Sequence, residues 1–271
     1  MNLQTLDNIP SWEWPENAGE FIFNVLGEKN APVSDRVLAA ELAGDITVMN
    51  DKMAALLLAI TEDSGEPEEL RCKAPISLGP ALEYGEMMEF DDFDDDMLSK
   101  KGFHEVQERL RSIYQNTDTP KKVRRRVLEA AVRAPMEWHK NAIQTAYASN
   151  DEEWVLTAVF CMGYVRGFDD QILESFKSEN PDIFYEAVCA AGNSEVKAAW
   201  PTIKGLITKD DIDKPLLIAA INAAVGICPG EAVDILSELS DSDDEEIAEA
   251  VEDALAMAIL LLDDQPEDEF F

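Results

Sequence analysis

The apolar residues of this chain recur mostly at intervals of three and four, the spacing that places them along one face of an α-helix. Val196, Trp200 and Ile203 show this spacing. No segment alternates apolar and polar residues as a half-buried β-strand does. The pattern predicts a first set of amphipathic helices at residues 18–26, 48–60, 103–114, 138–147, 168–176, 196–207 and 232–239. Two helix starts are marked by a cap residue before a proline at the first helical position, at Thr119-Pro120 and Asn180-Pro181.

A second set of helices is predicted from a recurring ten-residue frame. In its clearest copy, Leu70 and Arg71 open the frame, and Leu78 and Gly79 close it. The frame lies at residues 35–44, 70–79, 123–132, 154–163 and 183–192, and more loosely at 216–225 and 247–256. Five of the six spacings between copies fall between 29 and 35 residues. Because small residues in the frame let neighbouring helices approach closely, we expect seven stacked, antiparallel helix pairs.

This frame is similar to HEAT repeats, in particular to the short kind called phycobilisome-lyase HEAT-like repeats. The resemblance covers about residues 18–262 and implies an all-α fold, a right-handed α-α superhelix (a HEAT-like solenoid) of about seven helix pairs. It implies a single domain at residues 1–262, followed by an acidic C-terminal tail at 263–271. The one long spacing indicates an insertion at about residues 83–99, which fits neither helix pattern.

The known enzymes of this fold make specific demands on the sequence. Deoxyhypusine hydroxylases hold two irons with several His-Glu pairs, but this chain has two histidines and one such pair, His104-Glu105. We therefore expect no metal site and no cofactor. A HEAT-like DNA glycosylase needs a basic concave face, which a net charge of -34 does not favour. A chromophore lyase of this repeat family stays open, although no motif singles it out.

Composition narrows the function further. The chain has 56 acidic and 22 basic residues, a balance that argues against nucleic acid and anionic membranes as partners. It has no apolar run long enough to span a membrane, no signal-peptide pattern and no Cys-x-x-Cys pair among its four cysteines, so we expect a cytoplasmic protein with reduced thiols. Alternatively, the acidity is an adaptation to high salt and says nothing about partners.

The charges are unevenly distributed along the chain. Residues 97–140 hold 11 of the 22 basic residues against 5 acidic ones, whereas 16 acidic residues and no Lys, Arg or His follow Lys214. The insertion carries eight acidic residues between Glu83 and Asp96, without the ligand spacing of an EF-hand. Two interpretations of the insertion stay open: a solvated, mobile loop, or a segment that packs on the neighbouring basic repeat.

Helical geometry predicts which residues of the frame face a partner. Its third, fourth, seventh and eleventh positions are expected on a concave ridge, where Arg, Tyr and Phe provide binding energy. The candidate partner-binding residues on this ridge are Arg125, Arg126, Arg133, Phe160, Tyr164 and Tyr185. Alternatively, the aromatic side chains are buried in the core. The arginines at the second position, Arg36, Arg71 and Arg124, are expected to join acidic residues of adjacent repeats in a structural ladder.

These observations predict a non-enzymatic scaffold for protein–protein interactions, a monomer that binds an acidic, apolar partner segment in the concave groove of repeats three to five. In a variant of this hypothesis, a basic partner binds the acidic C-terminal repeats and tail. The alternative is a lyase or protein-modifying enzyme that uses the same groove, with Cys189 or Tyr185 as the reactive group. That alternative requires an exposed Cys189 thiol of lowered pKa. His139, beside Trp138, is expected to be a surface or packing residue.

Overall fold

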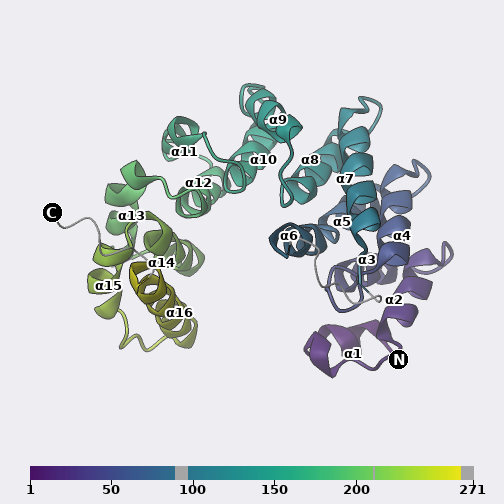
Figure 1. The fold of residues 1–271 in the computed structure, drawn as a ribbon, viewed down its shortest axis with the longest axis horizontal. Coiled ribbons are helices and arrows are strands. Elements are labelled where there is room, and N and C mark those ends of the chain that lie inside the picture. The colour runs from purple at the N-terminus through teal and green to yellow at the C-terminus, as the bar shows by residue number, and fades with distance from the viewer. Residues whose placement is uncertain (89–96, 210, 264–271) are drawn as a thin grey trace. The chain divides into compact units, whose positions relative to one another are not determined.

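The computed structural model describes residues 1–88, 97–209 and 211–263 (Figure 1). Every regular element among these residues is a helix. The chain divides into two compact units, which we describe separately: unit 1 is Met1–His139 and unit 2 is Lys140–Phe271. That residues 1–262 form a single domain stays a prediction.

Unit 1 is built from helix pairs that stack in chain order (Figure 1). An outer and an inner helix pack together in each pair: α2 (Ala18–Gly27) with α3 (Val33–Leu42), α4 (Asp51–Glu62) with α5 (Glu68–Ile76), and α7 (Lys100–Gln115) with α8 (Lys121–Ala131). The inner helices pack on one another in the order α3, α5, α8. Two shorter helices accompany them: α1 (Leu3–Asp7) lies on α3, and α6 (Gly79–Met87) lies on α7 and α8.

Unit 2 has the same arrangement. Its pairs are α11 (Asp169–Ser175) with α12 (Pro181–Asn193), α13 (Trp200–Ile207) with α14 (Lys214–Ile227), and α15 (Pro229–Ser237) with α16 (Glu245–Asp263). The inner helix α10 (Glu152–Met162), which follows α9 (Glu137–Tyr147), packs on α12, and the stacking continues through α14 to α16. Short 3-10 helices lie at Ser11–Glu13 and Lys197–Ala199. Within each unit, these pairs confirm the predicted all-α, HEAT-like fold.

Small side chains set the distance between inner helices of unit 2. A Cβ atom added to Gly192 of α12 would lie only 2.8 Å from the Cβ of Ala223 on α14. Carbon atoms in contact are normally separated by about 3.5–4.0 Å, so only a glycine permits this approach. The packing role expected for the small residues of the frame is therefore confirmed at this interface.

The arginines at the second frame position fasten each helix pair in unit 1. The last carbonyl groups of a helix have no donor within the helix and need one from elsewhere. In each pair, the arginine Nε of the inner helix donates to a carbonyl in the last turn of the outer helix. The three bonds run from Arg36 to Leu26 (2.9 Å), from Arg71 to Thr61 (3.0 Å) and from Arg124 to Tyr114 (2.8 Å).

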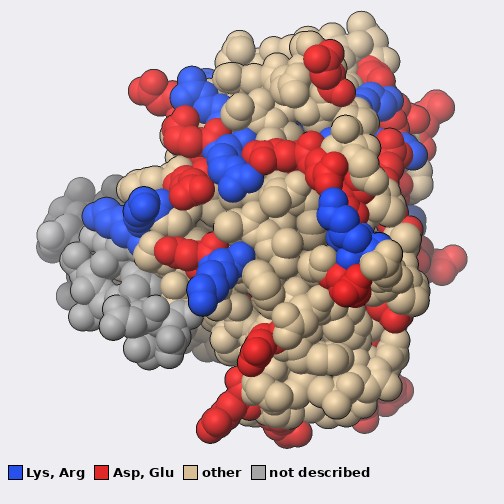
Figure 2. Space-filling view, turned by 90° about the vertical axis from the view of Figure 1, so that its right-hand side faces the viewer, with Lys and Arg blue, Asp and Glu red and all other residues tan. Residues whose placement is uncertain are grey.

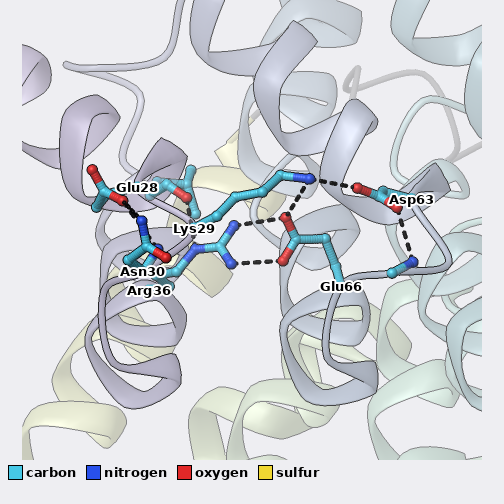
Figure 3. Close-up of polar contacts among 8 residues, drawn as sticks. Glu28, Lys29, Asn30, Arg36, Asp63 and Glu66 are labelled. Carbon is cyan, nitrogen blue, oxygen red and sulfur yellow. Dashed lines mark hydrogen bonds and ion pairs between the residues drawn. The ribbon is translucent and has the colours of Figure 1, made fainter.

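Arg36 also joins its repeat to the next one (Figure 3). Its guanidinium donates to both carboxylate oxygens of Glu66, which precedes α5, at 2.6 and 2.9 Å. These hydrogen bonds lower the pKa of Glu66 and keep it charged at neutral pH. Lys29 lies 3.8 Å from Glu66 and 2.9 Å from Asp63. The predicted ladder of arginines and acidic residues is thus confirmed at Arg36.

Of the two helix starts predicted from a cap residue before a proline, one is confirmed and one is shifted by a residue. Asn180 caps α12 as predicted, because its side chain accepts the N–H groups of Asp182 and Ile183 at 2.9 and 3.4 Å. The start of α8 was predicted one residue too early: the helix begins at Lys121, since Pro120 has the extended backbone (ψ 142°) of the preceding cap position.

Residues 83–87 are helical, in contrast to the prediction that the insertion fits no helix. They belong to α6, which has Pro80 in its first turn, where a missing N–H costs no hydrogen bond. Ala81, Leu82 and Gly85 are buried and hold the helix against its neighbours. Residues 89–96 of the insertion and 264–271 of the tail lie outside the described residues.

Candidate interaction surfaces

The three candidate arginines lie on or just after α8, in different surroundings. Arg126 is exposed, and its guanidinium donates to Glu129 one turn along the helix (2.5 Å). Arg133 is partly buried, and its Nη1 lies 2.5 Å from Glu83 Oε2 of α6. Arg125 is buried rather than exposed on a ridge, as is Glu129 one turn away. Of the three side chains, that of Arg126 is the most exposed, although its guanidinium is already paired with Glu129.

The beginning of the acidic insertion packs on the basic repeat. Besides the ion pair between Glu83 and Arg133, the Arg133 side chain lies directly over Gly79, where an added Cβ would be 2.7 Å from Arg133 Cδ. This is the contact that the packed interpretation of the insertion predicts for its first acidic residue.

Three residues of the basic cluster in residues 97–140, including Arg133, form ion pairs with acidic residues of neighbouring helices. Arg109 contacts Glu62 of α4 at 2.7 Å and Lys122 contacts Glu68 of α5 at 3.4 Å. Figure 2 shows basic and acidic side chains side by side on the face of unit 1 that it presents. Part of the excess of positive charge in this window is therefore offset by acidic residues that lie elsewhere in the sequence.

Three aromatic residues of unit 2, which we call the aromatic ridge, lie on neighbouring inner helices. Phe160 is on α10 and Tyr164 follows that helix; both are half-buried, and their ring centroids are 5.4 Å apart. Tyr185 is on α12, which packs on α10, and is 37% exposed. None of the three side chains is fully buried, in contrast to the alternative that they are buried in the core.

Cys189 and Tyr185, the two residues considered for an enzymatic role, do not have lowered pKa values. Burial raises the pKa of the Cys189 thiol to about 11, and the nearby Glu186 carboxylate adds to the effect. The pKa of Tyr185 is also raised, first by burial. Both groups are therefore neutral at physiological pH, and a neutral thiol is a poor nucleophile. Cys189 is therefore poorly suited to be the nucleophile that the enzymatic alternative requires.

His139 is a packing residue, as expected, but its burial is more complete than the sequence indicates. The side chain is 1% exposed and stacks on Trp138 at a centroid distance of 3.8 Å. Its Nδ1 accepts the N–H of Met136 at 2.8 Å, whereas its Nε2 has no hydrogen-bond partner among the described residues. Burial lowers the pKa of His139 to about 4, so the ring is neutral.

Sequence reasoning missed an exposed apolar surface on α16. Five of its large apolar side chains, at residues 257 and 259–262, are between 38% and 60% exposed. The signal in the sequence was the apolar run at residues 254–262, which is too short to span a membrane. Periodicity alone does not show whether a neighbouring element covers such a run.

The described residues hold no group of three or more His, Cys, Asp or Glu side chains arranged to bind a metal ion. None of their helices combines the length and the apolar character needed to cross a membrane.

No protein-family model and no curated protein matches the chain. Among solved structures, it is similar to Escherichia coli YibA, with 15% identity over 94% of this chain and 90% of that one, and a TM-score of 0.45. Human deoxyhypusine hydroxylase, in complex with glycerol, shares 14% identity over 89% and 96%, with a TM-score of 0.39. An archaeal HEAT-like repeats protein from Thermococcus onnurineus shares 14% over 90% and 98%, with a TM-score of 0.37. Similarities this remote carry no conclusion about function.

Proposed function

We propose that this protein is a non-enzymatic scaffold that binds a segment of a partner protein along its inner helices. The observation that carries the proposal is the aromatic ridge of unit 2, formed by Phe160, Tyr164 and Tyr185. Aromatic side chains present a large contact area and lose little conformational entropy on binding, so they contribute a large share of the energy at protein interfaces.

The packing beneath the aromatic ridge favours binding without rearrangement. An added Cβ on Gly163, at the end of α10, would lie 3.3 Å from the Asn193 side chain and 3.5 Å from the Ala190 backbone of α12. The two helices are therefore in close backbone contact, and buried Val159 and Val188 fix them further. A surface that is already ordered loses less entropy when a partner binds.

The proposed partner segment carries apolar and acidic residues. Its apolar side chains contact the aromatic ridge. Within unit 1, Arg126 is the most accessible of the candidate arginines for an acidic residue of a partner, because its side chain is 49% exposed, although it is already paired with Glu129. At Arg133, a partner carboxylate would have to replace Glu83. Buried Arg125 supports α8 rather than contacting the partner. That one segment contacts both α8 and the aromatic ridge stays a prediction.

Selection from a random peptide display library tests the proposal. Peptides selected on the full chain should be enriched in acidic and apolar residues and should bind Tyr185→Ala and Phe160→Ala variants at least about tenfold more weakly, the effect of losing an interface anchor. Trp12→Ala is the matched control, because Trp12 is a highly exposed aromatic residue of unit 1. Peptides that bind all three variants equally would show that the aromatic ridge is not the binding surface.

The proposal also includes a monomer located in the cytoplasm. All four cysteines are free, which is compatible with a reducing compartment. Light scattering of the purified chain tests the monomer, and a concentration-dependent mass near twice 30.1 kDa would contradict it.

A further inference from the structure

Within the described part of the chain, the last inner helix, α16, has one face that neighbouring helices cover and another that is exposed. Val251, Ala254 and Ala258 are buried, where α16 packs on α14 and α15. From Ile259 to Asp263 every residue is exposed. Soluble proteins seldom leave such contiguous apolar surface in water unless it contacts a partner.

Acidic residues continue the same uncovered face toward the start of the helix. Glu249, Asp253, Met257 and Leu260 follow one another at intervals of four, four and three, so they line one side of α16. All four are exposed. We call them the acidic–apolar stripe. It extends over about 16 Å, the rise of eleven residues in an α-helix.

The carboxylates of the stripe lie in a part of the sequence without basic residues. No Lys or Arg follows Lys214 in the sequence. Lys214 itself contacts Asp244 and Glu246, at 2.8 Å each, on the preceding part of the chain. Among the described residues, no basic side chain forms an ion pair with Glu249 or Asp253. Their charge is thus available to a partner.

We propose that the acidic–apolar stripe docks a basic, amphipathic helix of a partner protein. The aliphatic face of that helix would cover Met257 and Leu260, and its Lys or Arg side chains would pair with Glu249 and Asp253. An amphipathic helix suits the stripe because its own apolar residues recur at three and four, the spacing of the residues they would meet. This surface is on a different helix from the aromatic ridge and does not depend on it.

A second copy of the chain is a poor occupant for electrostatic reasons. Residues 140–271 contain 29 acidic residues against 7 basic ones. Two copies meeting through their stripes would place Glu249 and Asp253 of one chain near those of the other. Like charges brought together at an interface oppose association, whereas opposite charges accelerate it.

The test uses the full chain and a synthetic helical probe. The probe is a fluorescein-labelled peptide of three Leu-Lys-Lys-Leu-Leu-Lys-Leu repeats, and its affinity is measured by fluorescence anisotropy at physiological salt. Two comparison peptides separate the contributions: one with Glu in place of Lys, and one of the same composition whose order gives no apolar face. We expect binding of the first peptide only.

Variants assign the binding to the stripe. Combined Met257→Gln and Leu260→Gln should weaken binding at least about tenfold, and combined Glu249→Gln and Asp253→Asn about threefold or more. The matched control is combined Met87→Gln and Met88→Gln, which changes two exposed methionines of unit 1 and should leave binding unaltered. Tyr185→Ala should also bind like the unchanged chain, which distinguishes this surface from the aromatic ridge.

Three results would overturn the proposal. The first is equal binding of the peptide that has the same composition but no apolar face, which would indicate general charge attraction. The second is binding that Met257→Gln and Leu260→Gln leave unchanged. The third is a dimer, detected by light scattering, that these two substitutions dissociate, since the stripe would then be occupied by a second copy.

Discussion

The ion pair between Arg36 and Glu66 offers a quantitative test of how the repeats are held together. Arg36 donates three hydrogen bonds, one to Leu26 and two to Glu66. The two side chains are only 4% and 6% exposed. Arg36→Met removes every donor but keeps much of the apolar volume. Glu66 is then left with a buried charge whose nearest cation is the largely exposed Lys29, at 3.8 Å.

The expected loss follows from burial. Removing one partner of a buried ion pair costs about 3–5 kcal/mol of folding free energy. Arg109 and Glu62 form a pair of similar geometry between α7 and α4, with hydrogen bonds of 3.0 and 2.7 Å. Their side chains are 29% and 42% exposed. Arg109→Met should therefore cost about 1 kcal/mol or less.

Urea unfolding followed by circular dichroism measures both losses, and hydrogen exchange should place the Arg36→Met effect at α3 and α5. Combined Arg36→Met and Glu66→Leu should recover most of the stability, because no charge stays buried without a partner. Equal losses in Arg36→Met and Arg109→Met, or no recovery in the double variant, would contradict the reasoning.

Three further predictions concern single residues. The first is a pH dependence: because the pKa of His139 in the folded chain is lowered to about 4, the unfolded chain binds a proton at this residue first as the pH falls below about 6.5. The free energy of unfolding should therefore fall by about 2 kcal/mol between pH 7 and pH 5 through this group. Urea midpoints should fall more in the unchanged chain than in His139→Phe, and equal falls would refute this prediction. Asn180→Ala should destabilise the fold by about 1 kcal/mol through loss of the α12 cap, whereas Asn222→Ala at an exposed site in α14 should not, as paired melting curves will show. Iodoacetamide should alkylate Cys189 about a hundredfold more slowly than free cysteine at pH 8, because its pKa is raised to about 11; a rate near that of free cysteine would restore the enzymatic alternative.

The helix pairs were predictable because their signals are local. The three-and-four apolar spacing and the recurring frame each lie within one helix, and a proline or asparagine stands near many of the starts. Helix α6 was not predicted, because its buried residues, Ala81, Leu82 and Gly85, form only a short apolar stripe next to the acidic part of the insertion. Such a short helix is stabilised by packing on α7 and α8, and the local sequence pattern does not show this packing.

The surroundings of the candidate residues were less predictable because they depend on contacts between distant parts of the chain. Arg133 meets Glu83 fifty positions earlier, and Arg109 meets Glu62 forty-seven positions earlier. A charge count within one window therefore overstated the free positive charge near α8. The partial exposure of Phe160, Tyr164 and Tyr185 agrees with their frame positions, whereas Arg125, at the same frame position as Tyr185, is buried.

The central claim is that a partner segment binds the inner-helix surface of unit 2, and hydrogen–deuterium exchange tests it most directly. The full chain is compared with and without a peptide selected from the display library. We expect slowed exchange at the amides of α10 and α12 around Phe160, Tyr164 and Tyr185, and unchanged exchange in the outer helices α11 and α13. Slowed exchange confined to the outer helices, with none at α10 and α12, would contradict it.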